Sequence, residues 1–153
     1  PRRRSIDLDV VVDSEVERLR EETGTRVDMT GVSARLVDAD QPQMARLVRN
    51  LLNNAARHAR QRVTIALKQD DGVVRLVVED DGSGVPEHDR ERIFDRFTRL
   101  DEARTASTGG TGLGLAIARD IAVAHGGSIR CETALGGGAR FVVELPAVEE
   151  GET

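Results

Sequence analysis

The sequence has 153 residues, enough to bury one hydrophobic core, and it predicts a single domain. Charged residues make up 32% of the chain and the formal net charge is -5, which argues against a non-specific nucleic-acid binder because a phosphate backbone selects basic surfaces. No apolar run approaches the ~18 residues that a membrane-spanning helix needs, and no signal peptide opens the sequence. The single cysteine, Cys131, cannot form an internal disulfide, and we interpret it as a small strand residue in a reducing cytoplasm.

The first forty residues predict three short strands and one helix. Residues 1–4 are interpreted as the end of a linker. Apolar residues then alternate with polar ones as in a short strand: Ile6, Leu8 and Val10. Residues 12–22 have the spacing of an amphipathic helix, which Gly24 ends. The ranges 26–30 and 33–39 predict two further strands.

The best-specified helix of the sequence comes next. Asp40 is a candidate N-cap, Pro42 suits the first turn, and Gln43 completes a capping-box pattern. One apolar stripe at helical spacing runs along the helix: Met44, Leu47, Val48, Leu51, Leu52 and Ala55. The helix is predicted to extend to about His58.

A β-hairpin is predicted after this helix. The ranges 63–67 and 74–78 alternate between apolar and polar residues and flank an Asp71–Gly72 turn, and the second strand ends at Asp80. Residues 86–94 then predict one short helix.

The C-terminal part completes the predicted fold. Residues 95–112 are polar and glycine-rich without periodicity, which is typical of a mobile loop. A helix and two strands follow: 113–125, 128–133 and 140–145. These elements predict an α+β fold, a two-layer α/β sandwich with a mixed sheet of about five strands and about three helices on one face. We assign this domain to residues 5–148 and an acidic tail to residues 149–153.

Two asparagines lie four residues apart on the best-specified helix. Asn50 and Asn54 therefore point from one face, beside the apolar stripe, where they would border a cleft. Carboxamide oxygens are suitable hard ligands for a magnesium ion that keeps waters and phosphate oxygens as its other ligands. The alternative is a pair of ordinary surface asparagines. Three asparagines in five positions, with Asn53 between them, disfavour the helix locally and so favour a functional reason.

An acidic and glycine-rich stretch, residues 80–86, follows the hairpin directly. Asp80 keeps the parity of the apolar positions in its strand, so its carboxylate faces the apolar layer and needs a hydrogen-bond donor. The exocyclic amine of an adenine would supply one. Gly82 and Gly84 let the backbone turn and approach a flat ligand. The alternative is an ordinary Asp-Gly turn.

A second glycine-rich stretch, residues 109–115, runs straight into a helix. Backbone N–H groups at a helix N-terminus, with glycines for close approach, can form a phosphate site. The stretch is not a P-loop, because it lacks Gly-Lys-Ser/Thr, and the only lysine of the chain, Lys68, lies elsewhere. It is not a dinucleotide fingerprint either, because no strand precedes it and its third glycine has the wrong spacing.

The order and spacing of these patterns resemble those of the catalytic ATP-binding domain of bacterial two-component sensor histidine kinases, the HATPase_c domain of the GHKL superfamily. The matching stretches are residues 50–58 (NLLNNAARH) for the N box, Asp80-x-Gly82-x-Gly84 for the G1 box, Phe94-x-x-Phe97 for the F box and residues 110–115 (GTGLGL) for the G2 box. They occur in the family's order and cover about residues 40–127. The resemblance implies a Bergerat ATP-binding fold in which Mg·ATP lies between the N-box helix and a flexible lid of about residues 95–112.

The resemblance also implies a set of nucleotide-binding residues. They are Asn50, Asn54, Arg57, His58, Asp80, Gly82, Gly84, Val85, Ile93, Phe94, Phe97, Gly110, Thr111, Gly112, Leu113, Gly114 and Leu115. Among them, Asn50 and Asn54 would hold magnesium, directly or through water. Asp80 would bind the adenine amine, with Val85 and Ile93 packed near the base.

The remaining roles implied by the resemblance concern the phosphates. Arg57 and His58 would lie near them, and the two phenylalanines of the F box would anchor the lid. Arg99 and Arg104 are similar to lid positions from which a basic side chain reaches the γ-phosphate. Together with Asn50 they are the implied catalytic residues.

Position 50 separates this sequence from the wider superfamily. Gyrase-like, chaperone and MutL-type ATPases and the anti-sigma serine kinases carry a glutamate there, four residues before the metal-binding asparagine, as general base. Asn50 cannot take a proton from water or a serine hydroxyl at neutral pH, whereas a neutral histidine imidazole is already a nucleophile. The sequence therefore favours transfer to histidine. A serine kinase or ATPase of the same fold, and a nucleotide-binding module without transfer activity, are the alternatives.

None of the three histidines is a convincing phosphoacceptor. His58 lies in the N box, and His125 ends a helix, where a protonated imidazole suits the helix dipole. Residues 88–92 (HDRER) resemble the H-box pattern that carries a phosphoacceptor, but His88 lies on a short helix between the G1 and F boxes. The phosphoacceptor is therefore expected on a separate dimerisation/histidine phosphotransfer domain upstream.

Partners and location follow from the same resemblance. The next partner after the phosphoacceptor histidine would be a cognate response regulator, which receives the phosphoryl group on an aspartate. The isolated domain is expected to be a monomer and the full protein a homodimer. The domain would lie in the cytoplasm as part of an inner-membrane-anchored sensor.

Overall fold

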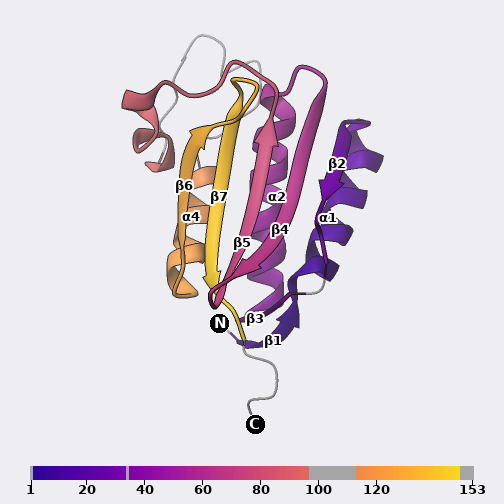
Figure 1. Ribbon diagram of the computed structural model, residues 1–153, viewed down its shortest axis with the longest axis vertical. Helices are drawn as coiled ribbons and strands as arrows, with labels where there is room; N and C mark the ends of the chain where they lie inside the picture. Colours follow the sequence, from indigo (N-terminus) through magenta and orange to yellow (C-terminus); the bar gives the residue numbers. More distant parts are fainter. Residues whose placement is uncertain (1, 34, 97–112, 149–153) are drawn as a thin grey trace.

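The computed structural model describes residues 2–33, 35–96 and 113–148 (Figure 1). The main sheet contains β2 (Arg26–Thr30), β4 (Arg62–Asp70), β5 (Val73–Asp80), β6 (Ser128–Thr133) and β7 (Ala139–Pro146). Its strand order is β2-β4-β5-β7-β6, with β2 parallel to β4 and the other neighbours antiparallel. One face carries α1 (Leu8–Thr23), α2 (Gln41–His58) and α4 (Gly114–Ala124). The predicted two-layer α+β fold with a five-stranded mixed sheet is confirmed.

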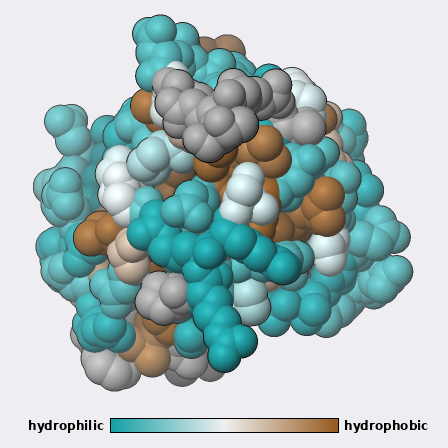
Figure 2. Space-filling view, turned by 90° about the horizontal axis from the view of Figure 1, so that it is seen from below, coloured by the Kyte–Doolittle hydropathy of each residue, from teal (hydrophilic) through white to brown (hydrophobic). Residues whose placement is uncertain are grey.

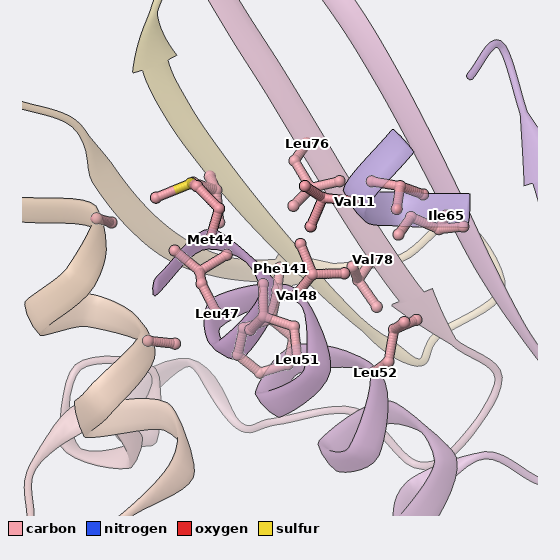
Figure 3. Close-up of a cluster of buried hydrophobic side chains, with 14 of the residues drawn as sticks. Val11, Met44, Leu47, Val48, Leu51, Leu52, Ile65, Leu76, Val78 and Phe141 are labelled. Atoms are coloured by element: carbon pink, nitrogen blue, oxygen red, sulfur yellow. The ribbon is translucent and has the colours of Figure 1, made fainter. Parts of the chain in front are cut away.

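Helix α2 supplies the centre of the core. The Asp40 carboxylate accepts the N–H of Gln43 at 3.1 Å, and Pro42 occupies the first turn, as predicted. The predicted apolar stripe is buried along its whole length: Met44, Leu47, Val48, Leu51, Leu52 and Ala55. Figure 3 shows Met44, Leu47, Val48, Leu51 and Leu52 beside residues of β4, β5 and β7: Ile65, Leu76, Val78 and Phe141. The burial of this stripe fixes α2 against the middle of the sheet.

Only one of the two hydrogen bonds of the capping box at the start of α2 is formed. The Asp40 carboxylate accepts the N–H of Gln43, but the N–H of Asp40 bonds His125 in place of the Gln43 side chain. The N–H of Asp40 donates to Nε2 of His125 at 3.1 Å, and Nδ1 of His125 lies 2.8 Å from the carbonyl oxygen of Ile121. Because that carbonyl can only accept, Nδ1 carries the proton and Nε2 is the acceptor. His125 is therefore a buried link between the end of α4 and the start of α2.

The N-terminal elements differ from the prediction. β1 (Arg4–Asp7) pairs antiparallel with β3 (Leu36–Ala39) in a separate two-stranded sheet, and β3 begins later than predicted. The strand predicted through Val10 is wrong, because α1 already begins at Leu8, whose N–H donates to the carbonyl oxygen of Arg35 at 2.9 Å. The apolar residues that α1 buries have helical spacing: Leu8, Val11, Val12, Val16 and Leu19.

The segment that follows β5 contains two short 3-10 helices in place of the single helix predicted over residues 86–94. They are η1 (Glu87–Asp89) and η2 (Arg92–Phe94). The N–H of Asp89 donates to the carbonyl oxygen of Pro86 at 2.9 Å, the three-residue spacing of a 3-10 turn. So short a segment does not offset the cost of nucleating an α-helix, and 3-10 turns satisfy the same backbone groups.

The face of the sheet away from the helices carries an ion-pair network. The apolar part of this face is a strip of three side chains: Ala66, Val77 and Val142. Charged side chains of β5, β6 and β7 flank the strip in five ion pairs: Arg75–Glu144 (2.7 Å), Arg130–Glu144 (2.9 Å), Arg130–Glu132 (2.6 Å), Arg140–Glu132 (3.3 Å) and Arg140–Glu79 (3.0 Å). Val142 is fully buried on this face, and the aliphatic stems of the neighbouring arginines can account for its burial.

β1, β3 and the end of β7 lie at the end of the molecule opposite the end of β5 (Figure 1). Figure 2 views this end, where hydrophilic side chains surround smaller hydrophobic areas. A cavity of about 160 Å³ opens there, lined by β3, the end of β7 and His125. None of the helices within the described ranges combines the length and hydrophobicity needed to cross a membrane.

Candidate functional site

The asparagines of α2 lie on the predicted face of the helix. Asn50 is half-buried and Asn54 is 8% exposed, whereas Asn53 is exposed. The side-chain amide of Asn50 donates to the carbonyl oxygen of Gly114 at 3.2 Å, and thus joins the middle of α2 to the first residue of α4. Since that carbonyl can only accept, the amide oxygen of Asn50 faces away from Gly114.

Basic groups gather at the C-terminal end of α2. The guanidinium of Arg57 donates to the side-chain oxygen of Asn54 at 3.3 Å. As a carboxamide oxygen, it is of the class of hard ligands that magnesium takes. Partial burial and the adjacent Arg57 cation lower the pKa of His58, which favours its neutral form. Arg57 therefore presents a permanent cation at this end of α2.

Asp80 lies at the end of β5 with its carboxylate in the apolar layer, as its parity predicts. It is 5% exposed. Oδ1 accepts the N–H groups of Gly82 at 2.9 Å and Ala139 at 3.3 Å. Oδ2 is also buried, yet it has no hydrogen-bond partner among the described residues. A buried carboxylate oxygen without a donor is costly, so this position suits a ligand that brings an N–H group.

Glycines let three backbone segments meet around Asp80. A Cβ on Gly82 would lie 2.1 Å from the carbonyl oxygen of His58, and one on Gly138 would lie 2.0 Å from that of Asp80. A Cβ on Gly84 would lie 2.5 Å from the carbonyl oxygen of Gly137. The end of α2, the loop after β5 and the turn between β6 and β7 therefore pack closely around Asp80. The cavity near His125 lies at the other end of the sheet.

The sequence does not identify two contacts at the end of β5. Gly138 and Ala139, which lie between the predicted strands 128–133 and 140–145, contact Asp80. The carboxylate of Asp81 accepts three consecutive backbone N–H groups, those of residues 60–62, at 2.7 to 3.3 Å. These N–H groups, that of Gln61 first, lower the pKa of Asp81. Asp81 thus fixes the link between α2 and β4, a role that only the long-range contact reveals.

Val85 and Ile93, predicted near the base, lie in the segment after β5 with Phe94, which was predicted to anchor the lid. Val85 is half-buried, and Ile93 and Phe94 are buried. The ring of Phe94 meets that of Phe141 edge-on, with centroids 6.1 Å apart. The guanidinium of Arg119 lies 5.6 Å from the centroid of the Phe94 ring. Phe94 therefore joins this segment both to the sheet and to α4.

The described residues cover part of the predicted phosphate region. Leu113, Gly114 and Leu115 are half-buried at the start of α4. Six predicted site residues lie outside the described residues: Phe97, Arg99, Arg104, Gly110, Thr111 and Gly112. His88 is exposed in η1 and lies 3.4 Å from the carboxylate of Asp89. The expectation that His88 is no phosphoacceptor stays a prediction.

Comparison with known proteins identifies the family. Residues 39–149 match HATPase_c, the histidine kinase-, DNA gyrase B-, and HSP90-like ATPase family. The sensor protein RstB of Escherichia coli strain K12 is 48% identical over 107 residues, which cover 70% of this chain and 25% of RstB. The chain spans between a fifth and two fifths of the length of such curated relatives.

Solved structures give the same result. The mycobacterial sensor histidine kinase MprB has a TM-score of 0.84 at 31% identity, covering 95% of this chain and 97% of that one. The ATP binding domain of PrrB from Mycobacterium tuberculosis has a TM-score of 0.79 at 25% identity, covering 97% of this chain and 100% of that one. Since the family match also covers more than half of the sequence, the chain belongs to the HATPase_c family, and its relatives there are sensor histidine kinases.

Proposed function

We propose that this chain binds Mg·ATP and donates the γ-phosphoryl group to a histidine on a separate phosphoacceptor domain of a sensor histidine kinase, for relay to a response-regulator aspartate. The observation that carries the proposal is the buried Oδ2 of Asp80, which has no donor among the described residues. The exocyclic amine of adenine is a donor of the right kind. Membership of a family of ATPases, and similarity to a domain described as ATP-binding, support ATP as the ligand.

Asn50 argues for transfer to histidine. Its amide cannot act as a general base at neutral pH, so activation of water or of a serine hydroxyl has no candidate base at this position. A neutral imidazole needs none. The amide nitrogen of Asn50 instead donates to Gly114, a bond that a glutamate at this position could not make when ionised. Serine kinase and ATPase activities are therefore the less favoured alternatives.

The phosphate end of the site is proposed from the arrangement of charges. The amide oxygens of Asn50 and Asn54 would hold magnesium, which supplies charge neutralisation when bound. Arg57 would contribute a cation from the same helix, since its guanidinium already lies 3.3 Å from the Asn54 oxygen. Arg99 and Arg104, in a proposed lid of residues 95–112, would reach the γ-phosphate. Such catalysis depends on positioning and on charge neutralisation.

The organisation of the whole protein is part of the proposal. Residues 5–148 would be the catalytic domain, with a linker end before it and an acidic tail after it. The phosphoacceptor histidine would belong to a dimerisation domain, so the full protein would be a homodimer that serves a cognate response regulator. A cytoplasmic domain of a membrane-anchored sensor fits this arrangement.

The role of Asp80 can be tested by base selectivity. ATP should bind far better than GTP, because a base without the amine leaves the buried carboxylate unpaired. Asp80→Asn should reduce that preference, measured by calorimetric titration with each nucleotide. If GTP bound the unmutated domain as tightly as ATP, Asp80 would not read adenine and the proposal would lose its main support.

Phosphoryl transfer can be tested with the domain and a partner fragment. Given Mg·ATP labelled at the γ-phosphate, the isolated domain should bind nucleotide but neither label itself nor turn ATP over. It lacks a nucleophile held in line, and proximity of that kind is worth several orders of magnitude in rate. Addition of the dimerisation fragment of the same kinase should restore acid-labile labelling, and His88→Ala should leave this labelling intact. Self-labelling on His88, or ATP hydrolysis independent of the fragment, would contradict the proposal, and nucleotide binding without labelling in trans would favour a non-transferring module.

A further inference from the structure

Arg90 connects two segments that pack around Asp80. It lies between η1 and η2 and is half-buried. Its Nε donates to the carbonyl oxygen of Val85 at 3.4 Å, and its Nη2 donates to Oγ1 of Thr133. Val85 belongs to the loop after β5, and Thr133 is the last residue of β6. One guanidinium thus joins the loop after Asp80 to the strand that leads into the β6–β7 turn.

The β6–β7 turn leads back to Asp80. Ala139, which follows this turn, donates its N–H to the Asp80 carboxylate at 3.3 Å. The loop and the turn also touch directly, since a Cβ on Gly84 would lie 2.5 Å from the carbonyl oxygen of Gly137. Arg90 therefore closes a ring of contacts that begins and ends at Asp80.

The partners of Arg90 indicate that it holds these segments in place and does not balance a charge. Within the described ranges, no carboxylate lies at ion-pair distance from Arg90, whereas its neighbour Arg92 pairs with Asp89 at 3.2 Å. Its acceptors are a backbone carbonyl and a hydroxyl, both neutral. Burial raises the pKa of Cys131 in β6 to about 11, and the Arg90 cation opposes this rise, which places the guanidinium near the inner face of the sheet.

We propose that Arg90 is a positioning residue for the base-binding end of the nucleotide site, an inference that rests on the proposed function. By holding Val85 and Thr133 at one distance from each other, it sets the spacing between the loop after Asp80 and the β6–β7 turn. This spacing fixes how the Asp80 carboxylate meets the edge of a purine. A carboxylate held in one place rejects a base that offers no donor, whereas a loosely held one adjusts to it.

The inference is tested with Arg90→Leu and Thr133→Val, which remove the donor and the hydroxyl. Calorimetry with ATP, ADP and GTP should show about a tenfold loss of affinity for both adenine nucleotides in Arg90→Leu, in the range expected for a lost hydrogen bond to a charged group. ATP and ADP should lose equally, because the change acts at the base. The preference for ATP over GTP should fall. Thr133→Val should act in the same direction, and the double variant should lose less than the sum of the two. Arg90→Lys, which keeps the charge but cannot span both acceptors, should bind with intermediate affinity.

A matched control separates positioning from general stability. Arg92→Leu removes an exposed arginine of the same segment, and it should leave all three affinities unchanged. If Arg90→Leu lowered the melting temperature while the ATP-to-GTP ratio stayed as in the wild type, Arg90 would be a structural clamp only and the inference would be wrong. A wild-type domain that bound ATP and GTP equally would instead contradict the proposed role of Asp80, so the two failures give different results.

Discussion

Two adjacent carboxylates at the end of β5 have opposite surroundings. Asp81 accepts three backbone N–H groups, which fully occupy it and lower its pKa. Asp80, one position earlier and on the other side of the strand, is buried with one oxygen that lacks a donor among the described residues. The alternation of a strand is sufficient to separate a residue that secures the backbone from one that is available to a ligand.

The asparagines of α2 allow a prediction with an internal control. Asn54→Ala should weaken Mg·ATP binding by about tenfold, about 1.4 kcal/mol, because it removes an oxygen that suits the ion. Magnesium-free ATP should bind almost as before. The test is a pair of titrations, with the ion present and with the ion chelated.

Asn53→Ala is the matched control, because Asn53 is exposed on the same helix. It should bind both forms of the nucleotide like the wild type. Equal losses for Asn54→Ala in the two titrations would contradict metal ligation by Asn54 and would assign it a role in packing alone.

At the level of elements, α4 is fastened to α2 at both of its ends. Asn50 binds the carbonyl oxygen of Gly114 at the start of α4, and His125 accepts the N–H of Asp40 at its end. The two helices that border the proposed site are therefore held in one register. The His125 ring bonds only backbone groups of the two helices, so the link depends on the shape of the ring and on its tautomer.

His125→Phe should reveal how much this connection contributes. The substitution keeps an aromatic ring of similar size but leaves the partly buried N–H of Asp40 without its acceptor, which costs about 1 kcal/mol. Urea unfolding followed by circular dichroism measures the loss. His88→Phe, a change at an exposed histidine, should stay within about 0.5 kcal/mol of the wild type. Equal stabilities for the two variants would mean that the His125 link contributes nothing.

At the scale of the whole molecule, charged side chains cover the face of the sheet that carries no helices. Arginines and glutamates alternate across β5, β6 and β7, so each ion pair shares a partner with the next. Networks of this kind stabilise more than isolated surface pairs do. The arrangement also leaves little apolar area for another sheet to stack on. The helix-covered face can thus be devoted to the core and the nucleotide.

The parts of the fold that the sequence predicts well are those specified locally. The cap, the stripe and the end of α2 all lie within the helix itself, and the β4–β5 hairpin has its turn residues between its strands. The start of α1 was mispredicted because Ile6, Leu8 and Val10 fit a strand and a helix equally well over so few residues. The pairing of β1 with β3 is non-local, and no pattern within either strand announces it.

The same distinction applies to the candidate site. The positions of Asn54 and Asp80 follow from helical spacing and strand parity, so the sequence placed both correctly. The contacts of Ala139 with Asp80, and of Arg90 with Thr133, join segments far apart in the sequence. Such contacts depend on how the strands are ordered in the sheet, which residue patterns alone do not determine.

The buried Oδ2 of Asp80, which has no donor within residues 2–33, 35–96 and 113–148, has a consequence for the lifetime of the protein. Under the proposed function, the nucleotide supplies this donor, so binding completes the interior as well as filling the site. By mass action, ATP in excess then shifts the folding equilibrium toward the native state. A fall in cellular ATP would therefore have two effects on such a kinase. It would lower the supply of the phosphoryl donor, and it would speed the loss of the domain to unfolding and proteolysis.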